Sequence, residues 1–260
     1  MTTVNEPNDS VVLSTLEFDV LWEAERLPPA HPALRVPSPG RTHSERRALV
    51  EQAWESLADR RLARGKRVSG ELMDQLHLLA SPRVAIDIWV WTDRQIKGLA
   101  VSTGSQALLG VVDRDEVWLI PARDTSLPES AVSVAGELPA GIGRSVSAPH
   151  TVVRDADAAA KGEPKALVTA LADRGVVLWQ AQELAGMLVG MTTRGQFGVE
   201  RAGRDGVTRR ADRVIAFHDT DAGRYLVQVS PNNDGQAWVT VAPADNQLLA
   251  NRIWELLEEV

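Results

Sequence analysis

Two distant stretches of the sequence predict the same strand-to-helix junction. The first is WLIPARD at residues 118–124, and the second is WVTVAPAD at residues 238–245; they align with one inserted residue. Proline cannot donate a hydrogen bond to a strand ladder, so it ends the strand, and the acid or a following Ser can cap the next helix. Such residues suit any junction of this kind, so the local match alone does not require duplication. The shared order of elements around it favours two copies of one unit.

The first half of the chain predicts helices, then strands, then a helix. Ser14 with Glu17, and Thr42 with Glu45, form capping boxes that predict two helix starts. Over residues 84–91 the apolar period changes to two, which predicts a strand with Val84, Ile86, Ile88 and Val90 on one face and Ala85, Asp87, Trp89 and Trp91 on the other. Further strands are expected near residues 96–102, 107–112 and 117–120.

The second half predicts the same order. Pro164 suits a helix start and Gly175 a helix end. Asp245 predicts the N-cap of a final helix. Between them, alternating apolar residues and turn sequences predict strands at about 195–202, 207–218, 224–230 and 237–242.

Together these patterns predict an α/β chain of the α+β kind. We expect a central, mainly antiparallel sheet with flanking helices, and two halves related by a pseudo-two-fold axis. The expected organisation is a disordered N-terminus at residues 1–10, an N-terminal half at 11–138, a linker rich in Pro, Gly, Ser and Ala at 139–163, and a C-terminal half at 164–260. The two halves are expected to form one compact unit.

Composition excludes or disfavours several classes of protein. The chain of 260 residues has no cysteine, which excludes disulfides, thiolate metal sites and thiol nucleophiles. The net charge is −7 without a long basic cluster, which disfavours nucleic acid as a partner. No apolar run has the length of a membrane span, and MTTVNEPNDS has no features of an export signal. We therefore expect a cytoplasmic protein with no nucleic-acid or membrane partner.

The sequence also contains no recognisable catalytic or cofactor motif. The five histidines show no metal-ligand spacing, and there is no GxSxG serine and no P-loop. Gly141 and Gly143 begin a GxG pattern, but Val146 stands where the third Gly is needed. We expect no cofactor, no metal and no catalytic residue, and therefore not an enzyme. An enzyme with a site dispersed along the sequence remains an alternative.

Several segments, taken in order, carry a resemblance to a known family. They are RGQFG at 194–198, RRAD at 209–212, HDTDAGRY at 218–225, WVTVAPAD at 238–245 and the opening LSTLEFDVLWEAERLPPAHPAL at 13–34. With the length and the Arg-rich composition, this ordered set resembles the EspG family, the chaperones associated with ESX (type VII) secretion in mycobacteria and related actinobacteria. The resemblance covers about residues 11–258.

The resemblance implies a cytosolic chaperone with a quasi-two-fold α/β fold. Family members bind a PE–PPE heterodimer at the apolar tip of the PPE protein, keep it soluble and direct it to its secretion system, without nucleotide or metal. The alternative is a non-catalytic binding module of the same fold with a different partner, or with a second copy of itself as a homodimer.

A chaperone of this kind needs surface residues that cover apolar side chains of its partner. The candidate contact residues are Gln196, Phe197, Arg209, Arg210, Trp89 and Trp91. Each has a simpler interpretation: Phe197 between glycines as a core residue, the two tryptophans as packing under helices, and the two arginines as a solvated strand edge. The second half carries more of the family-like segments, so contacts are expected mainly within residues 164–260.

Overall fold

The computed structural model describes residues 10–260, and the chain divides into two compact units. The first unit comprises Met1–Trp89, Gln95–Val134 and Glu200–Arg209. The second comprises Val90–Arg94, Ala135–Val199 and Arg210–Val260. Of the expected disordered N-terminus, residues 1–9 lie outside the described part of the chain. Within the described residues no helix is long and apolar enough to cross a membrane.

The sheet of the first unit is an antiparallel meander with one added edge strand. Its strand order is β1-β7-β6-β5-β4, and β1 pairs antiparallel with β7, β7 with β6, and β6 with β5. The bounds are β1 Val11–Ser14, β4 Val84–Trp91, β5 Gln95–Thr103, β6 Gln106–Asp113 and β7 Glu116–Ala122; a separate small hairpin contains β2 Ala63–Arg64 and β3 Arg67–Val68. The last two residues of β4 belong to the second unit.

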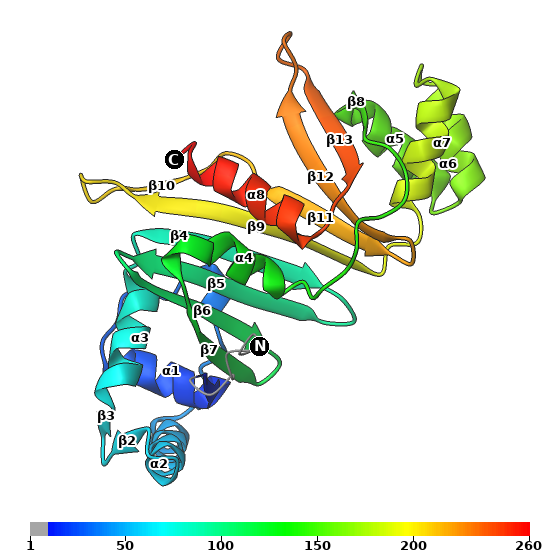
Figure 1. Ribbon diagram of the computed structural model, residues 1–260. Helices are drawn as coiled ribbons and strands as arrows, with labels where there is room; N and C mark the ends of the chain where they lie inside the picture. The colour runs from blue at the N-terminus through cyan, green and yellow to red at the C-terminus, as the bar shows by residue number, and fades with distance from the viewer. Residues whose placement is uncertain (1–9) are drawn as a thin grey trace, which may run out of the picture. The chain divides into compact units, whose positions relative to one another are not determined.

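Helices cover both faces of this sheet (Figure 1). Three helices follow β1, and a fourth, preceded by a short 3-10 turn, follows β7. Their bounds are α1 Thr15–Ala24, α2 His43–Asp59, α3 Gly70–Ala80 and α4 Leu127–Ser133, with 3-10 turns η1 Pro32–Leu34 and η2 Asp124–Ser126. Both predicted capping boxes are confirmed: for example, Glu17 N–H donates to Ser14 Oγ at 3.1 Å while Ser14 N–H donates to Glu17 Oε2 at 2.7 Å.

The core of the first unit lies mainly between α1–α3 and the sheet. Apolar residues from all three helices join alternate strand residues there, including Phe18, Leu57, Leu76, Leu99 and Val101. The intervening strand residues, such as Ile86, Ile88, Ala100 and Leu109, are also buried, and α4 contacts β5 and β6. The sheet is therefore apolar on both faces, which explains why β4 does not show the alternation of a half-exposed strand.

The second unit repeats this design. Its strand order is β9-β11-β12-β13-β8, and each neighbouring pair is antiparallel. The bounds are β8 Val146–Pro149, β9 Thr193–Ala202, β11 Ile215–Thr220, β12 Gly223–Pro231 and β13 Ala237–Pro243. A short strand β10, Thr208–Arg210, pairs with β9. The end of β9 from Glu200 onward and β10 up to Arg209 belong to the first unit. The predicted strand at 207–218 is therefore two strands, β10 and β11.

Three helices again follow the edge strand, and one follows the meander. They are α5 His150–Ala160, α6 Pro164–Ala172, α7 Leu178–Leu188 and α8 Asn246–Leu257. The first three pack with β8 and β13 around a core that includes Val153, Leu171, Leu184 and Val239. α8 contacts β11 and buries Leu249, Ile253 and Leu256. As predicted, Asp245 caps α8, accepting a hydrogen bond from Leu248 N–H at 2.8 Å.

The segment expected to be a linker, residues 139–163, instead contains β8 and α5. Three of its five Gly and Pro residues, Pro139, Gly141 and Gly143, lie at its beginning. From Val146 onward, alternate residues Val146 and Ala148 are buried, and the Ala-rich stretch that follows buries Val153, Ala156 and Ala160. Alanine has the highest intrinsic helix propensity, so this stretch favours a helix. The second copy therefore begins at β8 rather than at Pro164.

With this correction, the two copies show the same order: an edge strand, three helices, a four-strand meander and a final helix. The repeated Trp-to-Asp junction lies in β7 and β13, the strands that pair with the edge strands. Pro121 and Pro243 lie beyond the residues that pair with β1 and β8. Each proline therefore lies where its missing N–H removes no hydrogen bond to the edge strand. The mainly antiparallel sheet with flanking helices is confirmed; the pseudo-two-fold axis stays a prediction.

A buried arginine holds the beginning of the second unit. The Arg224 side chain is 0% exposed and forms a bidentate ion pair with Asp219, with Nε–Oδ1 at 2.7 Å and Nη2–Oδ2 at 3.0 Å. Its remaining N–H groups donate to Ala135 O at 2.8 Å, to Gly136 O at 3.1 Å and to Asn246 Oδ1. One side chain thus joins two strands, the segment that enters the unit and the first residue of α8.

The neighbours of Arg224 in HDTDAGRY reinforce the same attachment. Tyr225 Oη donates to Ile142 O at 2.9 Å and its ring stacks on His218. Gly223, at φ +120°, lies so close to Gly141 that a Cβ there would be 2.7 Å from the Gly141 Cα. A Cβ on Gly141 would in turn lie 2.2 Å from the Tyr225 ring. The segment that carried much of the resemblance therefore has a structural role.

We predict that Arg224→Met lowers the free energy of unfolding by about 3–5 kcal/mol, because it leaves the Asp219 carboxylate buried without its partner. Arg154→Met is the matched control, since Arg154 pairs with Asp155 on the exposed surface of α5. We expect that change to cost less than about 1 kcal/mol. Urea unfolding of both variants measures the difference, and equal losses would contradict a special role for Arg224.

Burial of His218 also makes the stability of the protein depend on pH. Its Nε2–H donates to Met187 O at 2.7 Å, and burial lowers the pKa of His218, against the opposing influence of this hydrogen bond and of Asp219. Below about pH 6.5 the unfolded chain gains a proton at His218, whereas the folded protein does so only at lower pH. The contribution of His218 to the free energy of unfolding is therefore fully present above about pH 6.5 and is lost as the pH is lowered.

We predict a contribution of up to about 1.4 kcal/mol per pH unit to this fall, the limit for one proton. Urea unfolding at a series of pH values between 7 and 5 measures the slope. His218→Gln should reduce it, while the exposed His43 provides the control substitution His43→Ala. An unchanged slope in His218→Gln would show that other groups cause the acid sensitivity.

Candidate binding surface

The structure places Phe197 in the core of the second unit. It lies in β9, is 0% exposed and stacks on Phe217 of β11 with ring centroids 5.6 Å apart. Gln196 points to the other side of the strand, where it is half-buried. The interpretation of Phe197 as a core residue therefore fits its position, since an enclosed side chain presents no surface to a partner.

The two tryptophans of β4 are both half-buried. Trp89 Nε1–H donates to Asp87 Oδ1 at 2.8 Å, in agreement with the expected common face of these residues. Trp91 lies under the guanidinium of Arg194, whose Cζ is 5.5 Å from the ring centroid. This cation–π contact joins Trp91 to Arg194. Arg194 is the first residue of the RGQFG segment and lies two residues before Gln196.

Arg209 and Arg210 lie in β10 and are exposed. Arg209 already has a partner: its Nη2 lies 2.5 Å from Asp205 Oδ2 within the same hairpin. Hydrogen bonds from Arg209 and from the backbone N–H of Val207 lower the pKa of Asp205 to about 2. The pair is fully solvated, so it shapes the hairpin more than it stabilises the fold. Val207 at its tip is 55% exposed.

Sequence reasoning missed an exposed apolar surface at the start of α7. Three successive residues, Val177, Leu178 and Trp179, are 55%, 56% and 51% exposed. Single exposed apolar residues are common on protein surfaces, whereas contiguous ones mark interaction sites. The available signal was the run VVLW directly after Gly175, where a helix start usually carries polar capping residues.

A neighbouring loop is attached to α7 through Glu183. Glu183 lies four residues after Trp179 and therefore on the same face of α7. Its carboxylate accepts a hydrogen bond from Arg144 N–H at 3.1 Å, which attaches the loop around Gly143 to this face. Ile142 in that loop is 78% exposed. We call Val177, Leu178 and Trp179 together the α7 apolar surface.

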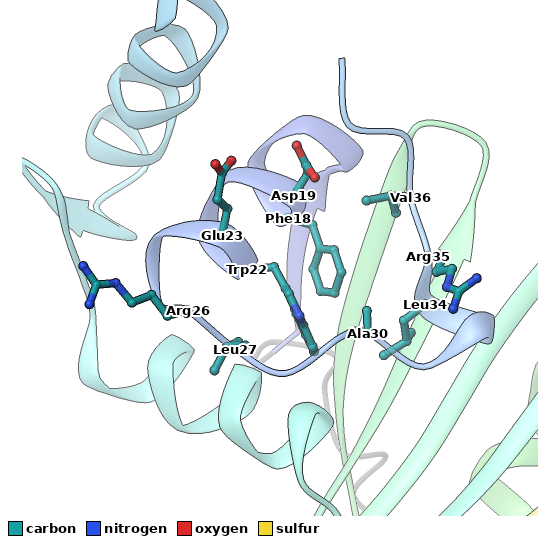
Figure 2. Close-up of a pocket in the computed structure, with 10 residues that line it drawn as sticks. All are labelled: Phe18, Asp19, Trp22, Glu23, Arg26, Leu27, Ala30, Leu34, Arg35 and Val36. Carbon is teal, nitrogen blue, oxygen red and sulfur yellow. The ribbon is translucent and has the colours of Figure 1, made fainter. Parts of the chain in front are cut away.

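The first unit contains a small recess beside α1, shown in Figure 2. It has a volume of about 310 Å³, and Phe18 and Trp22 face Ala30 and Leu34 across it. Its two carboxylates are paired with Arg46: Arg46 Nη1 lies 2.6 Å from Asp19 Oδ2, and Arg46 also pairs with Glu23. Trp22 Nε1–H donates to Pro28 O at 2.7 Å. These contacts fix the loop after α1 and provide no evident reactive group.

The chain thus has an α+β fold built from a repeated unit. Its second copy contains a helix, α7, that begins with exposed apolar residues. Comparison with known protein families identifies the family of the chain. Residues 14–255 match the EspG family, and the chain belongs to that family. A search of curated proteins found no match.

A solved structure with the same fold is the type VII secretion system chaperone EspG5 of Mycobacterium tuberculosis, determined in complex with a PE25–PPE41 dimer. The two chains are 12% identical, the similarity covers 96% of each, and the TM-score is 0.75. At this identity the similarity shows a common fold. The predicted family and fold are therefore confirmed.

We predict that truncating Phe197 and truncating Trp179 affect the stability very differently. Phe197→Ala should lower the free energy of unfolding by about 3–5 kcal/mol, because it leaves a cavity in the core. Trp179→Ala should change it by no more than about 0.5 kcal/mol, because the side chain is half exposed and contributes little to the core. Urea unfolding distinguishes the two, and a large loss for Trp179→Ala would mean that Trp179 is a structural residue.

Proposed function

We propose that this protein is a cytosolic, non-enzymatic chaperone for a PE/PPE-like helical pair of a type VII (ESX) secretion system. It binds the apolar tip of the PPE-like protein, keeps the pair soluble and directs it to export. Membership of the EspG family and the common fold with EspG5 support this proposal. The observation that carries it within this chain is the α7 apolar surface.

The sequence of α7 supports selection for binding at this position. Val177 is the N-cap of the helix and makes no side-chain capping hydrogen bond. Valine is among the poorest N-cap residues, and its substitution for Ser or Asp typically costs about 1 kcal/mol. An apolar run at this position therefore brings no local benefit to the helix, whereas it provides surface for an apolar partner.

The physical basis of such a chaperone is mass action. Covering an apolar tip removes it from water, which is favourable by roughly 25 cal/mol per Å² before the costs of association. A stable interface of this type buries on the order of 1,200–2,000 Å² in total. Few residues carry most of the binding energy, and Trp is enriched among them. Trp179 is therefore the expected centre of the contact.

The decisive experiment is co-expression with a PE/PPE-like helical pair from the same organism. We predict that the pair co-purifies with the protein and is more soluble in its presence. Failure of both would contradict the chaperone function. Isolation of the protein as a stable homodimer through the α7 apolar surface would instead favour the alternative, a module that binds its own second copy.

We predict that Trp179→Glu and Val177→Glu weaken the complex by roughly 30-fold or more, equivalent to about 2 kcal/mol for a hot-spot residue. Val207→Glu is the matched control, because Val207 and Val177 have equal exposed fractions of 55%. Isothermal titration calorimetry measures all three. If Val207→Glu weakens binding and Val177→Glu does not, the contact lies on the hairpin of Arg209 and Arg210 instead.

A further inference from the structure

Three side chains that could bind a metal converge within the first unit. His31 precedes η1, Asp87 lies in β4, and Glu200 lies near the end of β9. One ligand atom of each lies within 4.8 Å of the other two, and His31 Nε2 is 3.6 Å from Glu200 Oε1. Because these residues are far apart in sequence, no local spacing could have revealed the cluster.

Backbone contacts fix the segments that carry these residues. Ala202 N–H, two residues after Glu200, donates to Arg83 O just before β4 at 2.8 Å. Asp87 is 2% exposed, and its carboxylate accepts the 2.8 Å hydrogen bond from Trp89 Nε1–H. Such a bond to a ligating carboxylate is a common supporting contact in metal sites because it orients the ligand.

A cavity opens onto the cluster. It has a volume of about 500 Å³, and its lining includes His31, Glu200, Pro28, Leu99 and Thr208. His31 and Glu200 side chains are 19% and 22% exposed. Small ions and water therefore have access to His31 and Glu200 from this side, whereas Asp87 is buried. An open side of this kind leaves room for water as a further ligand.

We propose that His31, Asp87 and Glu200 form a binding site for a divalent transition metal ion, with Zn²⁺ as the best fit. One imidazole and two carboxylates are a donor set that suits Zn²⁺, and water would complete a four-coordinate shell. Tetrahedral Zn²⁺ places its ligand atoms roughly 3.3 Å apart. The His31–Glu200 separation is already near this value, and the Asp87 ligand atom lies within 4.8 Å of both.

The hydrogen bonding of His31 determines what binding requires. Its Nδ1 accepts a hydrogen bond from Ala33 N–H at 3.2 Å, so the ring proton lies on Nε2 in the metal-free protein. An ion at Nε2 requires the proton to move to Nδ1 through solvent, and the Ala33 hydrogen bond is given up. Because neutral His and ionised carboxylates are the binding forms, affinity falls as the pH is lowered.

The bound ion would connect three segments of the first unit: the loop before η1, strand β4, and the hairpin that begins at Glu200. This role is separate from the α7 apolar surface, whose residues belong to the second unit. We therefore expect the ion to stabilise the first unit and to leave the affinity for a helical pair unchanged.

The test uses the full-length, untagged protein, freed of metal with a chelator. Titration with Zn²⁺ in a calorimeter should give one site per chain and raise the melting temperature. Titration with Co²⁺ should produce the visible absorption of a four-coordinate ion with nitrogen and oxygen ligands. His31→Ala and Glu200→Gln should each reduce the affinity at least tenfold and abolish the thermal shift.

His43→Ala is the matched control, because His43 is exposed at the start of α2, outside the cluster. It should bind as the unaltered protein does. Circular dichroism and urea unfolding in the absence of metal show whether each variant is folded. No binding to the unaltered protein, or equal affinity in folded His31→Ala, would overturn the proposal.

Discussion

The buried ion pair between Arg224 and Asp219 is the interaction on which the second unit depends most directly. A buried charge is tolerated only where it is paired and its remaining polar hydrogens are satisfied. Arg224 meets this condition because two carbonyls of the entering chain, Ala135 and Gly136, and the Asn246 side chain accept its other hydrogen bonds. The backbone adds to this: Arg224 N–H donates to Pro139 O, and its carbonyl accepts from both Gly141 and Ala244. The path of the chain into the second copy is therefore set by a polar contact rather than by apolar packing alone.

The features that could be predicted from the sequence are those set by residues close together along the chain. Capping boxes at Ser14 and Thr42, the cap at Asp245 and the strands of the first meander follow from spacings of two to four residues, which local physics determines. The segment at 139–163 was misjudged because Gly and Pro at its start outweighed the Ala-rich stretch behind them. In that stretch the burial of Ala156 and Ala160 against α6 and α7 decides the structure.

The candidate site was less predictable, because exposure is a property of the whole fold. Phe197 between two glycines has the pattern of a protruding aromatic, yet Phe217 of the neighbouring strand encloses it. The HDTDAGRY segment, distinctive enough to support a family resemblance, holds the chain together through the buried Arg224 and Tyr225. His31, Asp87 and Glu200 meet only because β4 and the end of β9 are brought together by folding. Sequence distinctiveness thus indicated the family correctly, whereas the contact residues stay a prediction.

Comparison of the two copies provides an internal reference for the proposed surface. The third helix of the first copy, α3, begins with Ser69 as N-cap followed by Gly70 and Glu71. The third helix of the second copy, α7, has Val177, Leu178 and Trp179 at the same three positions. Both helices bury leucines of their later turns against their own sheet, so the fold makes the same demand on each. It requires no apolar residue at the N-cap or the first two helical positions, as Ser69 and the exposed Gly70 and Glu71 of α3 show. The fold therefore does not require the apolar residues at the start of α7. A surface for an apolar partner accounts for them.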